Sequence, residues 1–236
     1  MQEIQSKLKN LSVVLPAYNE QDNISHTIKK VFTIIPRFAE EFEVIVTNDG
    51  STDNTKGCLE ALSDKYTSLK VITHEVNKGY GAALRSGFSK AKYDYIFYTD
   101  GDGQFDVEEI EKLVCLLSSC DIAAAFRMTR SDGLHRALNA HAYNLFVNLL
   151  FGLNVKDIDC AFKLLKRGVF DSIDLKSNGA FISAELLIKA KKKGYVIKQC
   201  GVKHLARKKG KPTGNRPQVI IKAFIELFKL WKELKQ

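Results

Sequence analysis

Residues 95–106 read Tyr-Ile-Phe-Tyr-Thr-Asp-Gly-Asp-Gly-Gln-Phe-Asp, an apolar run that ends in alternating carboxylates and glycines. The apolar half predicts a buried β-strand. Asp100, Asp102 and Gln104 follow at a period of two, so an extended backbone would point all three side chains to one side. Such oxygen donors suit Mg²⁺ or Mn²⁺, which takes its other ligands from water and phosphate. The stretch therefore predicts a metal site at a strand end.

An acidic turn between a strand and a helix is the alternative interpretation of these residues. Asp106 has the position of a helix N-cap, and Glu109 has that of its capping-box partner. Capping explains Asp106, but it gives no role to Asp100 or Asp102. We therefore expect the metal site and the cap to coexist in this loop.

Strand-like and helix-like segments alternate upstream of this loop. This order predicts one α/β domain with a mostly parallel, twisted sheet, in which ligands bind beyond the carboxyl ends of the strands. The predicted strands are 11–15, 42–46, 71–74 and 95–98, and the predicted helices are 22–35, 55–66 and 81–92.

The composition is that of an ordinary globular chain, with 236 residues, 45% hydrophobic and 27% charged. Its five cysteines form no C-x-x-C pair, which favours reduced thiols in a cytoplasmic protein. The first seven residues lack the apolar core of a signal peptide. No uncharged apolar run approaches the roughly 18 residues of a membrane span, so we expect a soluble or peripheral protein.

The formal charge of +9 favours anionic partners, among them nucleic acid, an anionic membrane face or a phosphorylated small molecule. The basic excess lies mainly after residue 187, in Lys189–Lys193 and in Lys203–Arg216. A solvated helix face accounts for the first of these segments. The second combines cations with Gly and Pro, which predicts a phosphate-binding loop.

Five motifs together identify a family resemblance, and they are Pro16–Glu20, Asn48–Asp53, Asn77–Gly81, Asp100–Asp102 and Asp157–Lys163. The chain resembles the inverting family 2 glycosyltransferases of the GT-A fold, and most of all their dolichyl- or polyprenyl-phosphate sugar transferase branch. The resemblance runs from about residue 11 to about residue 217, and Asn48 departs from it where the family usually has an acidic residue.

The resemblance implies a Rossmann-like sheet flanked by helices. We expect a catalytic domain at 1–217, followed by an amphipathic helix at 218–236. The resemblance also implies that a UDP- or GDP-linked sugar is the donor. It gives Pro16, Tyr18, Glu20 and Asp49 to the base and ribose, which agrees with the hydrogen-bonding capacity of a carboxylate. Further nucleotide-sugar contacts are implied for Asn77, Gly79, Gly81 and Asp100.

The nature of the acceptor decides which other residues are needed. A sugar hydroxyl requires a carboxylate base, whereas a lipid phosphate, with a second pKa of about 6, is largely ionised already and requires cations. Asp157 and Asp159 are both candidates for the base or for a sugar-orienting group. Asp102, with its metal, and Arg127 complete the predicted catalytic set. Candidate phosphate-binding cations are Arg127, Arg136, Lys163, Arg207 and Arg216, with His204 as an additional acceptor contact.

Two amphipathic stretches, 138–153 and 218–235, bear on the membrane. The second places Ile220, Phe224, Phe228 and Trp231 on one helical stripe, with lysines elsewhere. Such a helix lies in a bilayer interface or packs against the catalytic domain or a membrane-protein partner subunit.

We therefore expect a metal-dependent transferase that moves a mannose- or glucose-type hexose to a polyprenyl or dolichyl phosphate at the cytosolic membrane face. The alternatives are an enzyme of the same fold with a soluble glycan acceptor, and a non-catalytic anion- or nucleic-acid-binding module. Carboxylates facing a groove repel phosphates unless a cation intervenes, which argues against a nucleic-acid partner.

Overall fold

A computed structural model describes residues 7–128, 134–207 and 217–235, with side chains described over 7–128, 142–207 and 223–234. The strands form one seven-stranded sheet of order β3-β2-β1-β4-β6-β5-β7. Strand β6 is antiparallel to β4 and β5, and the other pairs are parallel. The predicted mostly parallel α/β sheet is thus confirmed. The strands are β1 (Leu8–Ala17), β2 (Ala39–Asp49), β3 (Leu69–His74), β4 (Tyr95–Thr99), β5 (Ile122–Arg127), β6 (Phe162–Lys166) and β7 (Ile197–Val202).

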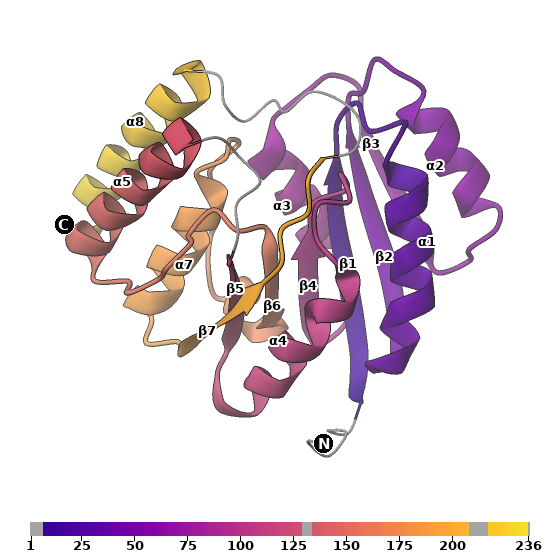
Figure 1. Ribbon diagram of the computed structural model, residues 1–236, viewed down its shortest axis with the longest axis horizontal. Helices are drawn as coiled ribbons and strands as arrows, with labels where there is room; N and C mark the ends of the chain where they lie inside the picture. The colour runs from indigo at the N-terminus through magenta and orange to yellow at the C-terminus, as the bar shows by residue number, and fades with distance from the viewer. Residues whose placement is uncertain (1–6, 129–133, 208–216, 236) are drawn as a thin grey trace.

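Helices flank this sheet, with α1 and α4 on its near side in Figure 1. Helix α1 shows why: Ile24, Ile28 and Val31 recur at helical spacing and are fully buried. The central strand β1 is instead buried continuously from Leu11 to Ala17, as expected where a parallel sheet is covered on both faces. The helices are α1 (Ile24–Ile34), α2 (Thr55–Ser63), α3 (Tyr80–Lys90), α4 (Ile110–Leu116), α5 (Leu134–Phe151), α6 (Arg167–Asp171), α7 (Ile182–Lys192) and α8 (Pro217–Lys235), with 3₁₀ turns at Ile35–Arg37, Val107–Glu109 and Leu117–Ser119.

The helix cap after the acidic loop is only partly as predicted. The Asp106 side chain accepts a hydrogen bond from the Glu108 N–H, so Asp106 is an N-cap. The capping-box role of Glu109 is wrong, because its carboxylate pairs with Lys112 at 3.2 Å and accepts the Lys203 N–H at 2.8 Å. Glu109 therefore joins the start of α4 to the segment after β7.

Strand register gathers the motifs at one edge of the sheet. Ala17 lies opposite Asn48, and Asp49 lies opposite His74. In β5 and β7, the last two strands in the order of the sheet, Arg127 lies opposite Val202, and each is the last residue of its strand. The residues that follow these strands therefore share one edge, although they are far apart in the sequence.

Helices α5 and α8 lie side by side beyond β7 and α7 (Figure 1). The centroid of the Phe224 ring on α8 lies 5.7 Å from that of Tyr143 and 6.0 Å from that of Phe146, both on α5. Leu227 and Leu230 are buried beside it. Much of the apolar surface of α8 therefore packs against the protein, which leaves less of the predicted stripe for a bilayer. Among the described residues, no helix is both long enough and apolar enough to cross a membrane.

Candidate active site

The loop after β4 turns where an extended backbone was predicted. Residues 101–103 form a turn in which Gly103 has a φ of 72°. The Gln104 N–H donates to Asp102 Oδ1 at 3.0 Å, and its side-chain amide donates to the Leu205 carbonyl at 3.1 Å. The predicted same-side alternation is therefore wrong. The turn brings Gln104 to the segment after β7, and its role as a metal ligand stays a prediction that this geometry does not support.

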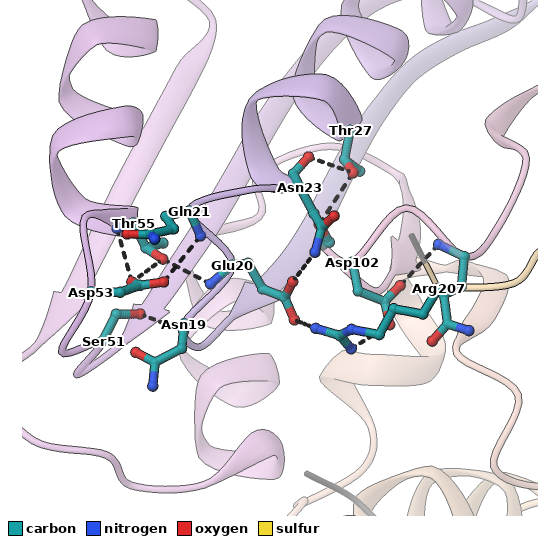
Figure 2. Close-up of polar contacts among 12 residues, drawn as sticks. Asn19, Glu20, Gln21, Asn23, Thr27, Ser51, Asp53, Thr55, Asp102 and Arg207 are labelled. Carbon is teal, nitrogen blue, oxygen red and sulfur yellow. Dashed lines mark hydrogen bonds and ion pairs between the residues drawn. The ribbon is translucent and has the colours of Figure 1, made fainter. Parts of the chain in front are cut away.

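Arg207 connects two acidic residues from different strand ends, as Figure 2 shows. Its guanidinium donates to Glu20 Oε1 at 2.5 Å and to Asp102 Oδ2 at 3.3 Å. The Asn23 amide donates to the other Glu20 oxygen at 2.7 Å. Burial raises the pKa of Glu20, while Asn23 and Arg207 oppose that rise. The structure thus brings together residues predicted separately for the nucleotide, the metal and the acceptor.

Asp100 lies beside this cluster in a partly buried position. The Tyr80 hydroxyl, at the start of α3, donates to Asp100 Oδ1 at 3.0 Å. Burial and the neighbouring charge of Asp102 raise the pKa of Asp100 to about 7. Two close carboxylates repel each other when both are charged, and a cation that they share offsets this repulsion.

Asp49 organises the loop between β3 and α3. Its buried carboxylate accepts the backbone N–H groups of Lys78 at 2.9 Å and Gly79 at 2.8 Å. His74 Nδ1 lies 2.6 Å from the same carboxylate, and its Nε2 lies 2.9 Å from Ser86 Oγ. Each of these contacts fixes the loop that carries the Asn77–Gly81 motif.

The Asn77–Gly81 motif itself is tied to a distant segment. The Gly81 N–H donates to the Asn178 carbonyl at 2.9 Å. Gly79 has a φ of 101°, and a Cβ there would come within 2.3 Å of the same carbonyl. The Asn178 carbonyl therefore accepts a hydrogen bond from the first turn of α3, and the Asn77–Gly81 loop borders the site. Of the other residues predicted to contact the nucleotide, Pro16 is buried, Tyr18 is half-buried and Asn77 is exposed.

Arg127 and Asp157 form an ion pair near the end of β5. The Arg127 Nε donates to Asp157 Oδ2 at 2.7 Å, and Nη2 donates to Oδ1 at 2.8 Å. Burial lowers the pKa of Arg127, but the bond with Asp157 outweighs it and the pKa is raised. Asp157 is buried, whereas Asp159 is exposed two residues later. The two candidate carboxylates thus differ in their access to solvent.

Lys163 lies in the protein core, away from the position expected of an acceptor-binding cation. Its side chain is fully buried. The ammonium donates to the carbonyls of Ile158, at 3.1 Å, and Cys160. It also lies 5.5 Å from the Tyr98 ring centroid. In this position Lys163 supports the 157–160 turn, so the structure contradicts its expected contact with an acceptor phosphate.

The remaining predicted acceptor residues are placed only in part. His204 pairs with Phe105 in a β-bridge, and their rings lie 5.1 Å apart. His204 therefore borders the acidic loop. Arg216 lies outside the described residues, and Arg136 lies on α5 where the side chains are not described.

The donor set suits a cation that binds together with phosphate. Within the described residues there is no group of three or more His, Cys, Asp or Glu side chains able to hold a metal ion. Asp100 and Asp102 offer two carboxylates. Mg²⁺ commonly takes one or two carboxylates from a protein, and phosphate and water complete its coordination shell. The residues present therefore fit Mg²⁺ or Mn²⁺.

Comparison with known protein families identifies the chain. The model of glycosyl transferase family 2 matches residues 12–174. The chain belongs to this family. The match begins within β1 and ends after α6, so it includes β2 to β6, the acidic loop and the 157–163 motif.

Curated relatives share this family. Glycosyltransferase AglD of Haloferax volcanii is 30% identical over 200 residues, covering 79% of this chain and 32% of that protein. The undecaprenyl-phosphate 4-deoxy-4-formamido-L-arabinose transferase of Yersinia enterocolitica is 28% identical and covers 71% of this chain and 52% of its own length. The dolichyl-phosphate beta-glucosyltransferase of Saccharomyces cerevisiae is 28% identical, and the alignment covers 80% of this chain and 65% of that protein. The chain therefore spans between 32% and 65% of the length of these relatives.

Solved structures confirm the predicted GT-A fold. Glucosyl-3-phosphoglycerate synthase from Mycobacterium tuberculosis, crystallised with Mn²⁺, UDP and glucosyl-3-phosphoglycerate, superposes with a TM-score of 0.71 at 21% identity. The superposition covers 92% of this chain and 79% of that one. The same enzyme with Mn²⁺ and UDP-glucose gives a TM-score of 0.70.

Sequence patterns did not indicate the roles of three residues at this edge of the sheet: Tyr80, Asn178 and His74. Tyr80 lies inside the Asn77–Gly81 motif, so its place in that motif was the available signal. Asn178 and His74 had no such signal, because only the fold brings them to the edge of the site. Their contacts are between segments distant in sequence.

Proposed function

We propose that this chain is a metal-dependent, inverting hexosyltransferase that uses a nucleotide-diphosphate sugar and a polyprenyl phosphate. Family membership supports sugar transfer, and relatives named for undecaprenyl and dolichyl phosphate support the acceptor. The observation that supports it most is the cluster in which Arg207, from the basic segment, meets Glu20 and Asp102 at the carboxyl edge of the sheet.

In the proposed reaction an acceptor phosphate oxygen attacks the anomeric carbon of the sugar. The bond from that carbon to the diphosphate oxygen breaks, and the nucleoside diphosphate leaves with the electron pair. A bound Mg²⁺ or Mn²⁺ would supply a Lewis acid for the developing negative charge. A phosphate acceptor brings its own anionic oxygen, so no protein base is required.

Chain residues then have distinct roles in this proposal. Asp100 and Asp102 would hold the cation, and Glu20 would contact the nucleotide. Arg207 holds phosphate, since a guanidinium can form two parallel bonds to its oxygens. The exposed Asp159 orients the sugar, whereas the buried Asp157 holds Arg127 in place.

Product formation from radiolabelled nucleotide sugars tests the acceptor. Polyprenyl phosphate should be glycosylated, while the dephosphorylated alcohol and soluble glycans should not. Transfer to the alcohol or to glycans, with none to the phosphate, would overturn the lipid-phosphate proposal. A thermal-shift panel of UDP, GDP and their sugars with Mn²⁺ identifies the donor, because a ligand at 100 times its Kd stabilises by about 2.7 kcal/mol.

We also propose that the α5–α8 pair faces an anionic membrane, on the cytosolic side. Leu145 and Leu149 on α5 are 54% and 76% exposed, and Ile225 and Phe228 on α8 are 50% and 48% exposed. The Phe146 and Phe228 rings, 6.1 Å apart, join the two helices. We call the four exposed side chains, Leu145, Leu149, Ile225 and Phe228, the apolar patch. Lys229 and Lys232 are exposed on the same helix α8, and they complement an anionic surface.

Point substitutions test this patch better than truncation after Pro217, which would also remove the buried Leu227 and Leu230. Leu149→Ser with Phe228→Ser should weaken sedimentation with vesicles containing phosphatidylserine. Val76→Ser is the matched control, because Val76 is 64% exposed just after β3, outside the patch. Unchanged vesicle binding in the double variant would exclude the patch from the membrane contact.

A further inference from the structure

We propose that Tyr80 is a positioning residue that orients Asp100 for the divalent cation. The inference rests on the proposed metal role of Asp100, and it adds a residue to which no function has been given. Tyr80 is the first residue of α3, whereas Asp100 follows β4. Their contact therefore fixes the acidic loop against a helix from another part of the sheet.

The hydrogen bond is specific to one carboxylate oxygen. The Tyr80 hydroxyl donates to Asp100 Oδ1 at 3.0 Å. Among the described residues, Tyr80 is the only hydrogen-bond donor to this carboxylate. The Asp102 carboxylate, in contrast, accepts from the Gln104 N–H and from Arg207. Tyr80 therefore selects the orientation of Asp100 and leaves Oδ2 for the cation.

Tyr80 is itself held from two sides, so it can act as a rigid support. On one side, the preceding Lys78 and Gly79 donate their N–H groups to Asp49. On the other side, the Gly81 and Ala82 N–H groups donate to the Asn178 carbonyl at 2.9 and 3.4 Å.

The Asn178 segment has its own anchors. The Asn178 side chain accepts a hydrogen bond from Arg85 on α3. The neighbouring Ser177 hydroxyl donates to Glu226 Oε2 on α8 at 2.8 Å. A helix start fixed in this way offers little freedom to the phenol ring that it carries.

Residues that orient a metal ligand typically change metal affinity by about 10- to 100-fold when they are replaced. Tyr80→Phe removes one oxygen and keeps the ring. We expect this substitution to raise the Kd for Mn²⁺ about 10-fold, measured in the presence of UDP or GDP from the electron paramagnetic resonance signal of free Mn²⁺. Tyr195→Phe is the control, because its hydroxyl bonds to the Gly168 carbonyl far from the loop.

A double-mutant cycle separates positioning from a general loss of structure. If Tyr80 acts through Asp100, Tyr80→Phe should have no further effect on Mn²⁺ affinity in an Asp100→Asn background. Equal losses in both backgrounds, or an unchanged Kd in the single variant, would overturn the inference. Circular dichroism and thermal melting report whether each variant is folded, and Tyr80→Gln, which restores a donor, should recover part of the affinity.

The outcome is independent of the acceptor assay. If Mn²⁺ affinity responds to Tyr80→Phe but polyprenyl phosphate is not glycosylated, the proposed acceptor fails and the inference stands. If sugar transfer occurs and Mn²⁺ affinity does not respond, only the inference fails. A wild-type protein that binds no Mn²⁺ would overturn the inference and the proposed metal dependence together.

Discussion

Replacement of Asp100 by Asn should stabilise the metal-free protein at alkaline pH. Burial and the charge of Asp102 raise the pKa of Asp100 from 3.8 to about 7 in the folded state. The folded state therefore holds a proton that the unfolded chain has already lost, so stability falls as pH rises between these two values. A tenfold difference in proton affinity between the folded and unfolded states corresponds to about 1.4 kcal/mol, so the loss of stability approaches a limit of about 4 kcal/mol above pH 7.

The assay is thermal and urea unfolding in EDTA at pH 5 and pH 8. We expect Asp100→Asn to have a higher Tm than the wild type at pH 8, by about 2–4 °C per kcal/mol for a chain of this size. The difference should shrink at pH 5, because Asp100 of the folded wild type is then largely protonated and so carries little charge. Added Mn²⁺ should stabilise the wild type more than the variant, because the cation offsets the negative charge of the Asp100 carboxylate, which the Asn side chain lacks.

Asp64→Asn, at an exposed position after α2, is the control for loss of one negative charge. An Asp100→Asn variant that is as stable as the wild type, or less stable, at pH 8 without metal would refute this reasoning. A gain in stability of equal size at pH 5 and pH 8 would show that it does not come from the protonation of Asp100.

Three further predictions concern the basic residues and the metal. Lys163→Met should lower the free energy of unfolding by about 1–3 kcal/mol in urea titrations, because it leaves the buried carbonyls of Ile158 and Cys160 without their donor. Arg207→Ala should raise KM for the phosphorylated acceptor more than it raises the Kd for the nucleotide. Lys203→Ala, at an exposed position, is the control. Equal changes in KM and Kd would contradict a contact between Arg207 and the acceptor phosphate. EDTA should abolish transfer and added Mn²⁺ should restore it, and transfer that persists in EDTA would exclude the metal.

Local pattern was sufficient for the first half of the fold. The apolar runs at β1, β2 and β4 are continuous because these parts of the strands are buried on both faces, and each run is followed by polar residues. The edge strand β3 was indicated by its short apolar run alone, because it is only partly buried. Strand β5 was not predicted, since the Ala-rich run Ile122–Arg127 has no strong strand preference. Strand β7 is half-buried and polar in places, and it exists through its pairing with β5. Pairing between distant segments leaves no periodic signal in either of them.

In the acidic loop too, the sequence indicated the chemistry of the residues but not their conformation. Its residue types, Asp100 and Asp102 after an apolar strand, indicate cation chemistry whatever the detailed conformation. The conformation itself depended on distant partners, since the Gln104 amide finds the Leu205 carbonyl and the backbone turns at Gly103. An extended chain, which the sequence spacing suggested, would forgo that contact.

The sequence by itself determined the family, the α/β class and the acidic strand end, because residue type and order encode them directly. Only the tertiary structure decided that Lys163 is a core support, that Arg207 joins Glu20 to Asp102, and that Tyr80 holds Asp100. The physical reason is that the role of a charged or polar side chain depends on its burial and its partner. Both are set by packing between segments up to 187 residues apart, as for Glu20 and Arg207.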